Sequence, residues 1–412
     1  MVKPWDTATI GDFLDFKNGL NKGKEFFGYG TPIVNYTDVY RKRSLTKNDV
    51  RGKVNLTRDE IHRFDAQKND VFFTRTSETP EEVGMSSVLL DDIDDCVFSG
   101  FVLRGRPKND MFTPEYCKYC FTTEAVRNAI TMGCTYTTRA LTNGKQLSAI
   151  EIVVPSKPEQ EAIAQSLTDI DELILSLEKL VAKKKAIKQG AMQELLTGKR
   201  RLPGFSGEWE TKKLEDYCSL ITKQTGFDYS AYIKPALITR KMPNTVPMIQ
   251  TINFRGRKFT FETDYYIPQS VAMQFPNIVL NKKCVLFSIV GASVGNVGLY
   301  PGNITAFCGG AIGITRFRNE QDAEWVFNYM SSPDGQSQIQ YVTKGGAQAT
   351  VTIADIRNFK IPTPEKNERD AISSILENMD HEIEVLEEKL AKYRQVKQGM
   401  MQQLLTGKIR LG

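Results

Sequence analysis

Histidine is nearly absent from this sequence: only His62 and His381 occur among its 412 residues. Acid–base catalysis and nucleophilic triads usually depend on histidine, so this composition disfavours both kinds of catalysis. The phosphate-loop motif G-x-x-x-x-G-K-[ST], the zinc motif H-E-x-x-H and an aspartate-rich calcium loop are also missing. The sequence therefore predicts a protein that carries no catalytic centre of its own.

Two segments have the spacing of functional motifs, but their contexts favour structural roles. The segment 291–298 has glycines of the kind that cradle phosphate, yet residues 299–302 have the pattern of a strand and a turn. No helix start is available to complete a nucleotide site, so we interpret the segment as a hairpin loop. Glu387-Glu388-Lys389 has the E-x-K spacing of nucleases, but it lies in a helical segment where alternating charges are expected to face water.

Long apolar runs and a disulfide framework are absent as well. No apolar run approaches the ~18–20 residues that span a bilayer, and residues 1–6 contain no apolar signal segment. The 7 cysteines are odd in number and irregularly spaced. Cys117 and Cys120 have metal-like spacing, but no second pair lies nearby to complete four zinc ligands. We expect a cytoplasmic protein with reduced thiols, no membrane contact and no bound metal.

The strongest positive feature is an internal repeat. Residues 163–202 return about 209 positions later as residues 372–411, and roughly half of the aligned positions are identical. The similarity extends to the openings of the two units, where Trp5 corresponds to Trp209. A period of this length is too long for a solenoid repeat, so it indicates two domain-plus-helix units in tandem.

Each unit has the sequence pattern of an α+β domain. Residues 70–75 and 284–290 are rich in β-branched and aromatic residues and are followed by turn formers, which is typical of strands. Apolar residues recur at helical spacing around Pro114–Ile130 and Asp322–Gln340, and each segment predicts one helix. We therefore expect short strands in a twisted or barrel-like sheet, interrupted by one helix, in each unit.

Each repeat ends in a long helix with a narrow apolar seam. The helices begin just after Pro158 and Pro364 and end near a Thr-Gly-Lys turn. At ~1.5 Å per residue, roughly 35 residues give a helix of ~50 Å. The seam residues step by four and three, as in a coiled coil. They are Ile163, Leu167, Ile170, Ile174, Leu177 and Val181 in the first helix, and Ile372, Leu376, Met379, Ile383, Leu386 and Leu390 in the second.

We expect the two helices to pack together along their seams, because an exposed helix with such a seam is only marginally stable alone. A whole globular unit separates them, so they can pair antiparallel. The predicted fold is α+β, with two domains joined by two long antiparallel coiled-coil helices in a dumbbell of pseudo-two-fold symmetry. Its predicted parts are a first domain at 1–157, a helical spacer at 158–197, a turn and linker at 198–208, a second domain at 209–363, a second helical spacer at 364–405 and a C-terminal turn at 406–412.

Basic, aromatic and small polar residues gather in loops of both domains, although the net charge is only +5. A net excess of this size is a weak indication of nucleic acid, so the placement of the charges matters more. Arginine suits guanine edges, glutamine suits adenine, threonine suits bases or phosphate, and lysine mostly contacts the backbone. For any one residue, a solubilising surface charge remains the alternative. The candidate DNA-contacting residues are Lys22, Lys24, Arg75, Arg104, Arg106 and Arg139 in the first domain, and Arg240, Lys241, Arg255, Arg257, Lys258, Lys344, Gln348 and Thr350 in the second.

The turns that follow the two helices carry a resemblance to a known family. Residues 196–202 and 405–411 both read L-T-G-K-x-R-L. Together with the repeat, they resemble the specificity (S) subunits of type I restriction-modification systems, and the match spans the entire chain. In that family two target-recognition domains alternate with two long helical regions. The resemblance implies that each domain reads one half of a bipartite, asymmetric site in double-stranded DNA, and that the helices hold the halves a fixed number of base pairs apart.

The resemblance also implies protein partners. Two methyltransferase (M) subunits would dock on the paired helices and bring S-adenosylmethionine, and restriction (R) subunits would bring ATP- and Mg-dependent activity. The chain itself would bind no cofactor and would not be an enzyme. The two domains share little sequence outside their framework positions, so we expect the two half-sites to differ.

Three alternatives stay open. A solitary S-like protein would exchange into a host complex and redirect or inhibit it. A coiled-coil scaffold that binds only protein predicts no salt-dependent DNA affinity, whereas phosphate contacts predict an affinity that falls with log salt at roughly 0.9 per neutralised phosphate. An independent enzyme is disfavoured by the missing catalytic residues.

Overall fold

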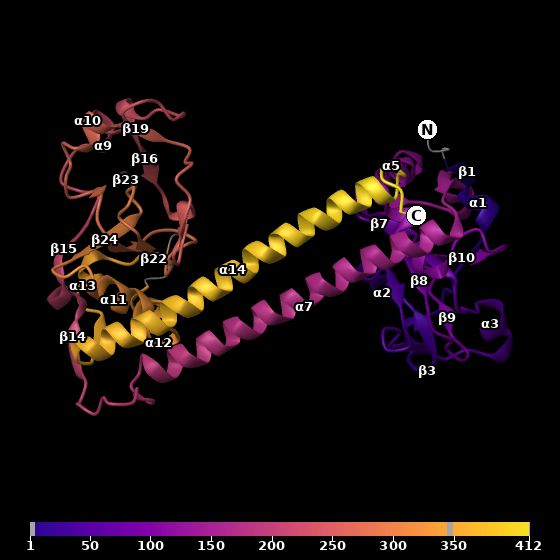
Figure 1. The fold of residues 1–412 in the computed structure, drawn as a ribbon, viewed down its shortest axis with the longest axis horizontal. Helices are drawn as coiled ribbons and strands as arrows, with labels where there is room; N and C mark the ends of the chain where they lie inside the picture. Colours follow the sequence, from indigo (N-terminus) through magenta and orange to yellow (C-terminus); the bar gives the residue numbers. More distant parts are fainter. Residues whose placement is uncertain (1–4, 344–348, 412) are drawn as a thin grey trace. The chain divides into compact units, whose positions relative to one another are not determined.

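The structure is a computed structural model that describes residues 5–343 and 349–411. It divides the chain into two compact units, which we call the first unit (Met1–Glu178 with Glu388–Gly412) and the second unit (Lys179–Glu387). Each unit combines one α+β domain with segments of two long helices (Figure 1). Among the described residues, no helix is long and apolar enough to cross a membrane.

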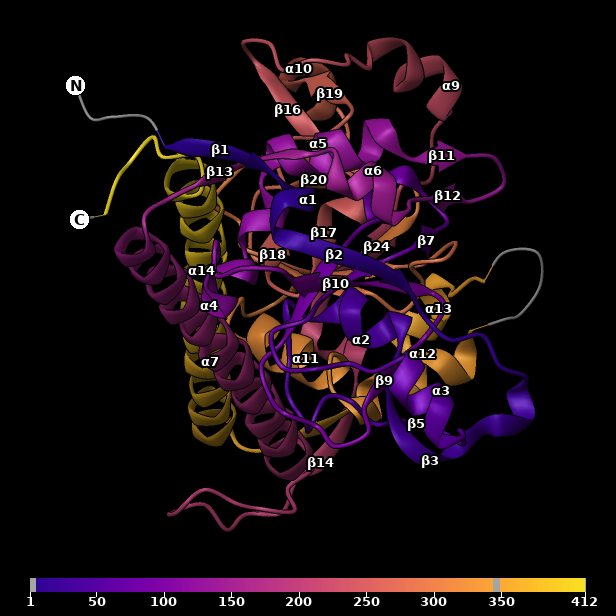
Figure 2. The ribbon, with the colours of Figure 1, turned by 90° about the vertical axis from the view of Figure 1, so that its right-hand side faces the viewer.

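The first domain contains a five-stranded sheet, two small sheets and a strand pair that closes the domain. β1 (Asp6–Thr9) pairs antiparallel with β13 (Glu151–Val154), next to the end of α14 in Figure 2. The main sheet has the order β2-β10-β6-β8-β4. Its strands are β2 (Leu14–Asn18), β10 (Val102–Pro107), β6 (Val71–Thr74), β8 (Ser86–Leu89) and β4 (Ser44–Leu45). One small sheet consists of β5 (Gly52–Val54), β3 (Phe27–Val34) and β9 (Val97–Phe98). The other consists of β11 (Thr135–Tyr136), β12 (Ala140–Leu141) and β7 (Thr76–Ser77).

The second domain repeats this plan. β14 (Glu210–Lys213) pairs antiparallel with β25 (Lys360–Thr363), as β1 does with β13. The sheet β15-β24-β21-β22 corresponds to β2-β10-β6-β8, and all of its pairings are antiparallel. Its strands are β15 (Cys218–Lys223), β24 (Ile312–Phe317), β21 (Cys284–Ser288) and β22 (Val297–Tyr300). A second four-stranded sheet consists of β19 (Tyr266–Pro268), β16 (Thr245–Ile249), β23 (Ala306–Cys308) and β20 (Val279–Leu280). β17 (Phe254–Arg255) pairs with β18 (Lys258–Phe259).

Short helices connect the strands in both domains. In the first domain the helices are α1 (Ile10–Phe13), η1 (Lys24–Phe26), α2 (Tyr36–Arg41), α3 (Arg58–Arg63), η2 (Pro80–Glu82), α4 (Pro114–Cys117), η3 (Cys120–Thr122), α5 (Glu124–Gly133) and α6 (Gly144–Ser148). In the second they are α8 (Leu214–Tyr217), α9 (Tyr229–Tyr232), η4 (Lys234–Ala236), η5 (Thr251–Asn253), α10 (Gln269–Ala272), α11 (Asp322–Met330), α12 (Pro333–Val342) and α13 (Ile353–Arg357).

The strand predictions are confirmed, while each predicted helix within a domain is divided. β6 and β21 lie where residues 70–75 and 284–290 predict strands, and the glycine-rich segment connects β21 to β22 as an antiparallel hairpin. The helix expected at Asp322–Gln340 is two helices, because Pro333 starts α12 and the hydroxyl of Ser332 caps it. The helix expected at Pro114–Ile130 divides into α4, η3 and α5, where Thr123 caps the last.

The long helices α7 (Lys157–Leu195) and α14 (Lys366–Leu404) each contain 39 residues, close to the predicted spans. Every predicted seam residue is buried or half-buried. In the first unit, Asp171 pairs with Lys397 and Glu178 with Arg394. Numbers therefore rise along one helix as they fall along the other, so the helices are antiparallel within this unit.

The same antiparallel pairing occurs in the second unit, where Lys184 pairs with Glu382 and Lys188 with Asp380. The seam residues nearest the start of each helix also belong to a domain core. Ile163 and Leu167 pack into the core of the first domain with Leu404 and Leu405 from the end of α14. In the second unit, Ile372 and Leu376 pack with Leu195 and Leu196 in the same way. Each domain core is therefore built partly from the start of one long helix and the end of the other.

A buried carboxylate closes the second unit. Glu368, in the first turn of α14, is fully buried and accepts two hydrogen bonds of 2.7 Å from Arg201. The indole Nε1 of Trp209 donates to the same carboxylate at 3.0 Å, and the guanidinium of Arg201 lies 5.4 Å from the Trp209 ring centroid. Gly198, with φ of +71°, lets the turn approach this indole closely.

The first unit contains the equivalent cluster. Glu159, in the first turn of α7, accepts hydrogen bonds from Arg410 and, at 3.1 Å, from Nε1 of Trp5. Arg410 lies 4.8 Å from the ring centroid of Trp5. A Cβ atom at Gly407 would lie 3.1 Å from this indole, so a glycine fits the position best. We call each cluster of tryptophan, glutamate and arginine a clamp. The arginines are those of the two L-T-G-K-x-R-L turns.

Replacement of Leu177 by aspartate tests the seam. Leu177 is 6% exposed, so an aspartate there buries a charge without a partner, and we expect the free energy of unfolding to fall by roughly 3 kcal/mol or more. The matched control is Leu175→Asp, because Leu175 is 51% exposed on the same helix. Denaturant unfolding followed by circular dichroism measures both. Equal destabilisation by the two variants would contradict the seam.

The first clamp predicts a pH dependence. The hydrogen bonds from Arg410 are the main cause that lowers the pKa of Glu159 from 4.5 to about 2. A carboxylate with a depressed pKa stabilises the fold above pH 4.5, and this stabilisation is lost as the pH falls towards 2. The difference in melting temperature between the wild type and Arg410→Gln should therefore be largest near neutral pH and shrink in acid. Lys408→Gln removes an equal charge from an exposed neighbour and serves as the control. A difference that stays constant with pH would argue against the clamp.

Candidate nucleic-acid interface

In each domain, the residues just after one central strand pair with a segment far along the chain. In the first domain β6 is followed directly by β7, and Ser77 of β7 pairs with Ala140 at the end of the loop 133–139. In the second domain β21 is followed by Val290, which forms a bridge with Thr350. Thr76 and Val290 therefore occupy equivalent positions, paired with Leu141 and Thr350. The shared position is a structural basis for two similar parts with different surface chemistry.

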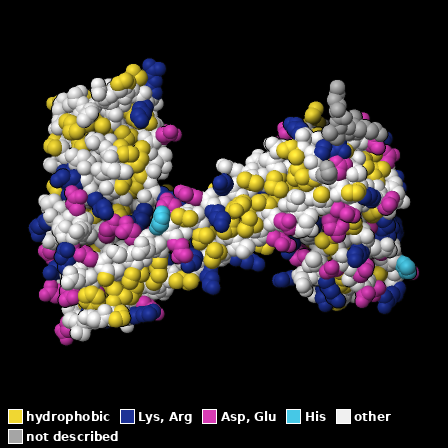
Figure 3. All heavy atoms as spheres, viewed as in Figure 1, with side chains coloured by type: hydrophobic (Ala, Val, Ile, Leu, Met, Phe, Trp, Pro, Cys, Tyr) yellow, Lys and Arg dark blue, Asp and Glu magenta, His cyan; other side chains and the backbone are white. Residues whose placement is uncertain are grey.

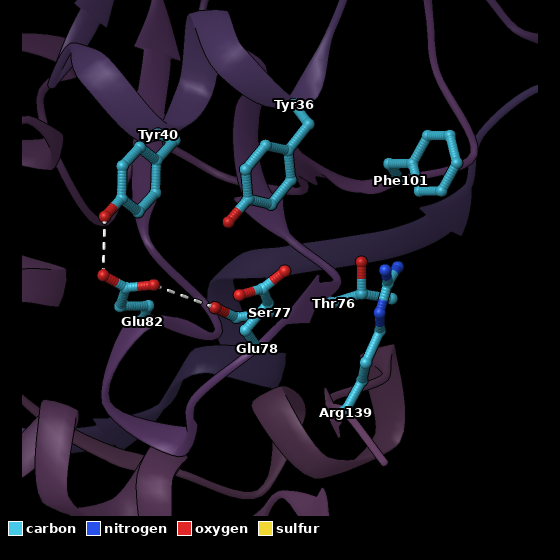
Figure 4. Close-up of a pocket in the computed structure, with 8 residues that line it drawn as sticks. All are labelled: Tyr36, Tyr40, Thr76, Ser77, Glu78, Glu82, Phe101 and Arg139. Carbon is cyan, nitrogen blue, oxygen red and sulfur yellow. Dashed lines mark hydrogen bonds between the residues drawn. The ribbon is translucent and has the colours of Figure 1, made fainter. Parts of the chain in front are cut away.

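A hollow of about 400 Å³ lies at this position in the first domain. Figure 4 shows side chains from three separate segments and the loop that ends at Arg139 facing it. It combines aromatic rings with hydroxyl groups, two carboxylates and one guanidinium. The lining residues are Tyr36, Tyr40, Thr76, Ser77, Glu78, Glu82, Phe101 and Arg139.

One wall of the hollow is fixed by hydrogen bonds. The carboxylate of Glu82 accepts from the Tyr40 hydroxyl at 2.8 Å and from Ser77 Oγ at 3.2 Å (Figure 4). Tyr36 stacks on Tyr40, with ring centroids 5.6 Å apart and an angle of 14° between the rings. The hydrogen bond to Glu82 raises the pKa of Tyr40, so the phenol remains protonated and keeps donating. The wall is therefore held before any ligand arrives.

The other side chains of the hollow are open to solvent. Phe101 is 58% exposed, and Glu78 and Arg139 are exposed as well. Within residues 5–343 and 349–411, neither the carboxylate of Glu78 nor the guanidinium of Arg139 has a hydrogen-bond or ion-pair partner. Both groups lie in the same hollow, and no ion pair joins them. One free acceptor and one free donor group are thus available to a ligand.

Arg104 is a correction to the predicted DNA-contacting set. Its side chain is 5% exposed, and its Nη1 lies 2.8 Å from Asp65 Oδ1. The neighbouring Arg106 binds both Asp65 and Asp70. Although burial opposes the change, the hydrogen bonds and charges of the two arginines lower the pKa of Asp65. Arg104 is therefore engaged inside the first domain, and we leave it out of the proposed DNA surface.

Lys22, Lys24 and Arg75 have different surroundings. Lys22 pairs with Glu60 at 2.7 Å and lies 4.5 Å from the ring centroid of Phe26. Lys24 is exposed and Arg75 is half-buried. Lys24 is therefore the most accessible of the three.

In the second domain, Arg257 and Lys258 contact acidic groups. Arg257 pairs with Glu324 at 2.8 Å and with Asp380 of α14 at 3.0 Å, so it holds the domain against the helix. We therefore also leave Arg257 out of the DNA surface. Lys258 pairs with Glu387 at 2.6 Å, although its side chain is 64% exposed.

The other predicted residues of the second domain differ in accessibility. Arg240, Lys241 and Arg255 are exposed, and Thr350 is half-buried beside Val290. Lys344 and Gln348 lie outside the described residues.

Sequence reasoning missed most of the hollow. Tyr36, Tyr40, Glu78, Glu82 and Phe101 were not predicted, although all five line it. Two signals point to part of it. Tyr36 and Tyr40 have the i, i+4 spacing of one helix face, and residues 75–78 directly follow a buried strand. No local pattern indicates that these two segments meet.

Two larger hollows lie where the end of a long helix meets its domain. The hollow in the first unit, of about 750 Å³, is lined by Arg394, Lys397, Gln398 and Met401 together with Arg43 and Lys408 of the same unit. The hollow in the second unit, of about 600 Å³, is lined by the residues 209 positions earlier in the repeat, which are Lys185, Lys188, Gln189 and Met192. The repeat thus builds two equivalent hollows. Among the described residues, no group of histidine, cysteine and carboxylate side chains could hold a metal ion.

Comparisons with known proteins agree with this organisation. The family model for the type I restriction modification DNA specificity domain matches twice, at residues 2–189 and 206–393. Two type I restriction enzyme specificity subunits of Methanocaldococcus jannaschii are similar over 99% of this chain: MjaX, at 25% identity over 94% of its length, and MjaVIII, at 23% over 93%.

Solved structures share the fold. The type I S subunit from M. genitalium matches with a TM-score of 0.60 at 13% identity, covering 97% of this chain and 96% of that one. A chain solved in work on complex assembly and conformational transition of the type I R-M system matches with a TM-score of 0.56 at 16% identity, covering 98% of both chains.

Paired variants test the division of the arginines into internal and surface groups. Arg104→Gln removes a buried ion pair, and we expect the free energy of unfolding of the first unit to fall by about 1–3 kcal/mol. Arg139→Gln changes an exposed side chain, and the effect should stay within about 0.5 kcal/mol. Thermal unfolding by calorimetry measures both. If Arg104→Gln unfolded like the wild type, Arg104 would return to the list of surface candidates.

Proposed function

Because this chain belongs to the type I restriction modification DNA specificity family, we propose that it is the subunit that selects the DNA target of a type I complex. Each domain reads one half of a bipartite, asymmetric site in double-stranded DNA. The chain binds no cofactor and catalyses no step itself. S-adenosylmethionine, ATP and Mg belong to its partner subunits.

The observation that carries this proposal is a repeated framework with different chemistry in the same place. The hollow beside β6 presents Glu78 and Arg139. After β21, Val290 bridges Thr350 as Thr76 pairs with Leu141, so Ala292 stands at the position of Glu78, and the position of Arg139 falls on Gln348, outside the described residues. Base edges are told apart by donors and acceptors at fixed positions. Two domains with different groups at one framework position are therefore suited to two different half-sites.

The positions of the exposed basic residues support DNA as the ligand. Lys24 in the first domain and Arg240, Lys241 and Arg255 in the second are exposed on their domains. Lysine and arginine contacts to phosphate give affinity without reading sequence. These residues are thus suited to contact the backbone while the hollow reads bases.

Two M subunits are the proposed partners of the paired helices, with R subunits joining the assembly. The two equivalent hollows, built from repeated residues, suit two copies of one partner. The helices also expose apolar side chains, and hydrophobic groups gather along their visible face in Figure 3. These exposed residues include Leu173, Leu175 and Val396 in the first unit and Leu180, Ile187 and Val385 in the second. Exposed apolar side chains of this kind mark interaction surfaces.

The test is co-expression with the methyltransferase subunit encoded in the same genome, followed by mapping of methylated bases. We expect a two-part motif with unlike halves and a constant gap. In a binding assay, the affinity of the complex for DNA should fall with log salt at roughly 0.9 per neutralised phosphate. A stable complex without methylation would favour an inhibitory S-like protein. Salt-independent or absent DNA binding would favour the protein-only scaffold.

A further inference from the structure

Glu78 is an unusual residue on a proposed DNA surface, because a free carboxylate is repelled by phosphate. A carboxylate is favourable there only where a donor of the DNA faces it. Figure 4 shows the carboxylate of Glu78 pointing into the hollow below Tyr36, and Arg139 entering from another side. The two groups share one hollow of about 400 Å³ without an ion pair between them. Something between them is therefore expected to offer a donor to one and acceptors to the other.

The major-groove edge of a C·G base pair has this property. Cytosine presents only the N4 amino donor, and guanine presents only the O6 and N7 acceptors. A carboxylate accepts from cytosine N4, and arginine donates to O6 and N7 of guanine. An A·T pair fits less well, because adenine presents a donor and an acceptor side by side, which suits an amide side chain. The hollow has no asparagine or glutamine.

The wall beside the two reading groups is fixed before a base arrives. Glu82 is already occupied by Tyr40 and Ser77, so it is not available as a second acceptor. The stacked Tyr36 and Tyr40 form a rigid aromatic wall beside Glu78. A wrong base would leave a donor or an acceptor of the hollow unpaired, which reduces the favourable free energy of binding.

We propose that this hollow reads one C·G base pair of the first half-site, with Glu78 accepting from cytosine N4 and Arg139 donating to guanine O6 and N7. This inference rests on the proposed function and adds the base pair and the two residues that specify it. The second domain has Ala292 at the position of Glu78, so it lacks this pair of reading groups. The contact therefore belongs to one half-site alone.

The experiment compares methylation motifs of complexes that contain the full-length wild type, Glu78→Ala or Arg139→Ala. Both variants should relax the same C·G position, with the preference for that pair falling roughly 10-fold to 100-fold. The other half-site and the gap should not change. The matched controls are Glu81→Ala and Arg63→Ala, which remove exposed charges of the same domain outside the hollow and should leave the motif unaltered.

The outcomes separate this inference from the proposed function. If the wild type gives a bipartite motif but either variant leaves it unchanged, or the two variants relax different positions, the C·G assignment is overturned and the proposed function stands. If the wild-type complex selects no motif, the proposed function fails and the assignment fails with it. Should Glu78→Ala not assemble, Glu78→Gln replaces it: a motif that still requires C·G would overturn the proposal, and one that admits adenine would support it.

Discussion

The clamp of tryptophan, glutamate and arginine is the interaction on which each unit depends. A carboxylate in the first turn of a long helix is favourable near the positive end of the helix dipole, but once buried it needs further donors. Arg201 and Trp209 supply them to Glu368, and Arg410 and Trp5 supply them to Glu159. The arginine always comes from the turn after the other long helix. Each domain therefore closes only when both helices are in place.

This dependence leaves the two candidate DNA surfaces free to differ. The clamp, the closing strand pair and the central strands recur in both domains. In the part of the chain that the structure describes, none of them involves the residues that follow β7 or Val290. The residues that hold the fold are thus separated from those that face the hollow. The first domain has glutamate and the second has alanine at the position of Glu78 and Ala292, and the framework contacts are the same in both. Such a separation allows specificity to change without loss of the fold.

The sequence predicted the repeated framework because its signals are local and occur twice. Apolar residues at steps of four and three predicted α7 and α14, and strand-like runs predicted β6 and β21. The candidate site could not be predicted as well, because the partner of a charged residue is set by the tertiary fold. Arg104 donates a hydrogen bond to Asp65, 39 positions away, and Arg257 donates one to Asp380, 123 positions away. The hollow assembles segments around residues 36, 76, 101 and 139, and no sequence pattern joins them.

A DNA-binding site that contacts a base through a carboxylate discriminates better between bases, but it attracts the phosphate backbone less. In the proposed contact, Glu78 would raise the free energy of every complex in which no base amino group faces it, so it would reject wrong bases more than it favours the right one. Affinity must then come from residues that do not read sequence, such as the exposed Lys24 in the same domain. The modest net charge of +5 is consistent with this division, because acidic residues serve specificity, the clamps and the helix pairing at once. Charge placement, more than net charge, therefore decides how such a protein reads DNA.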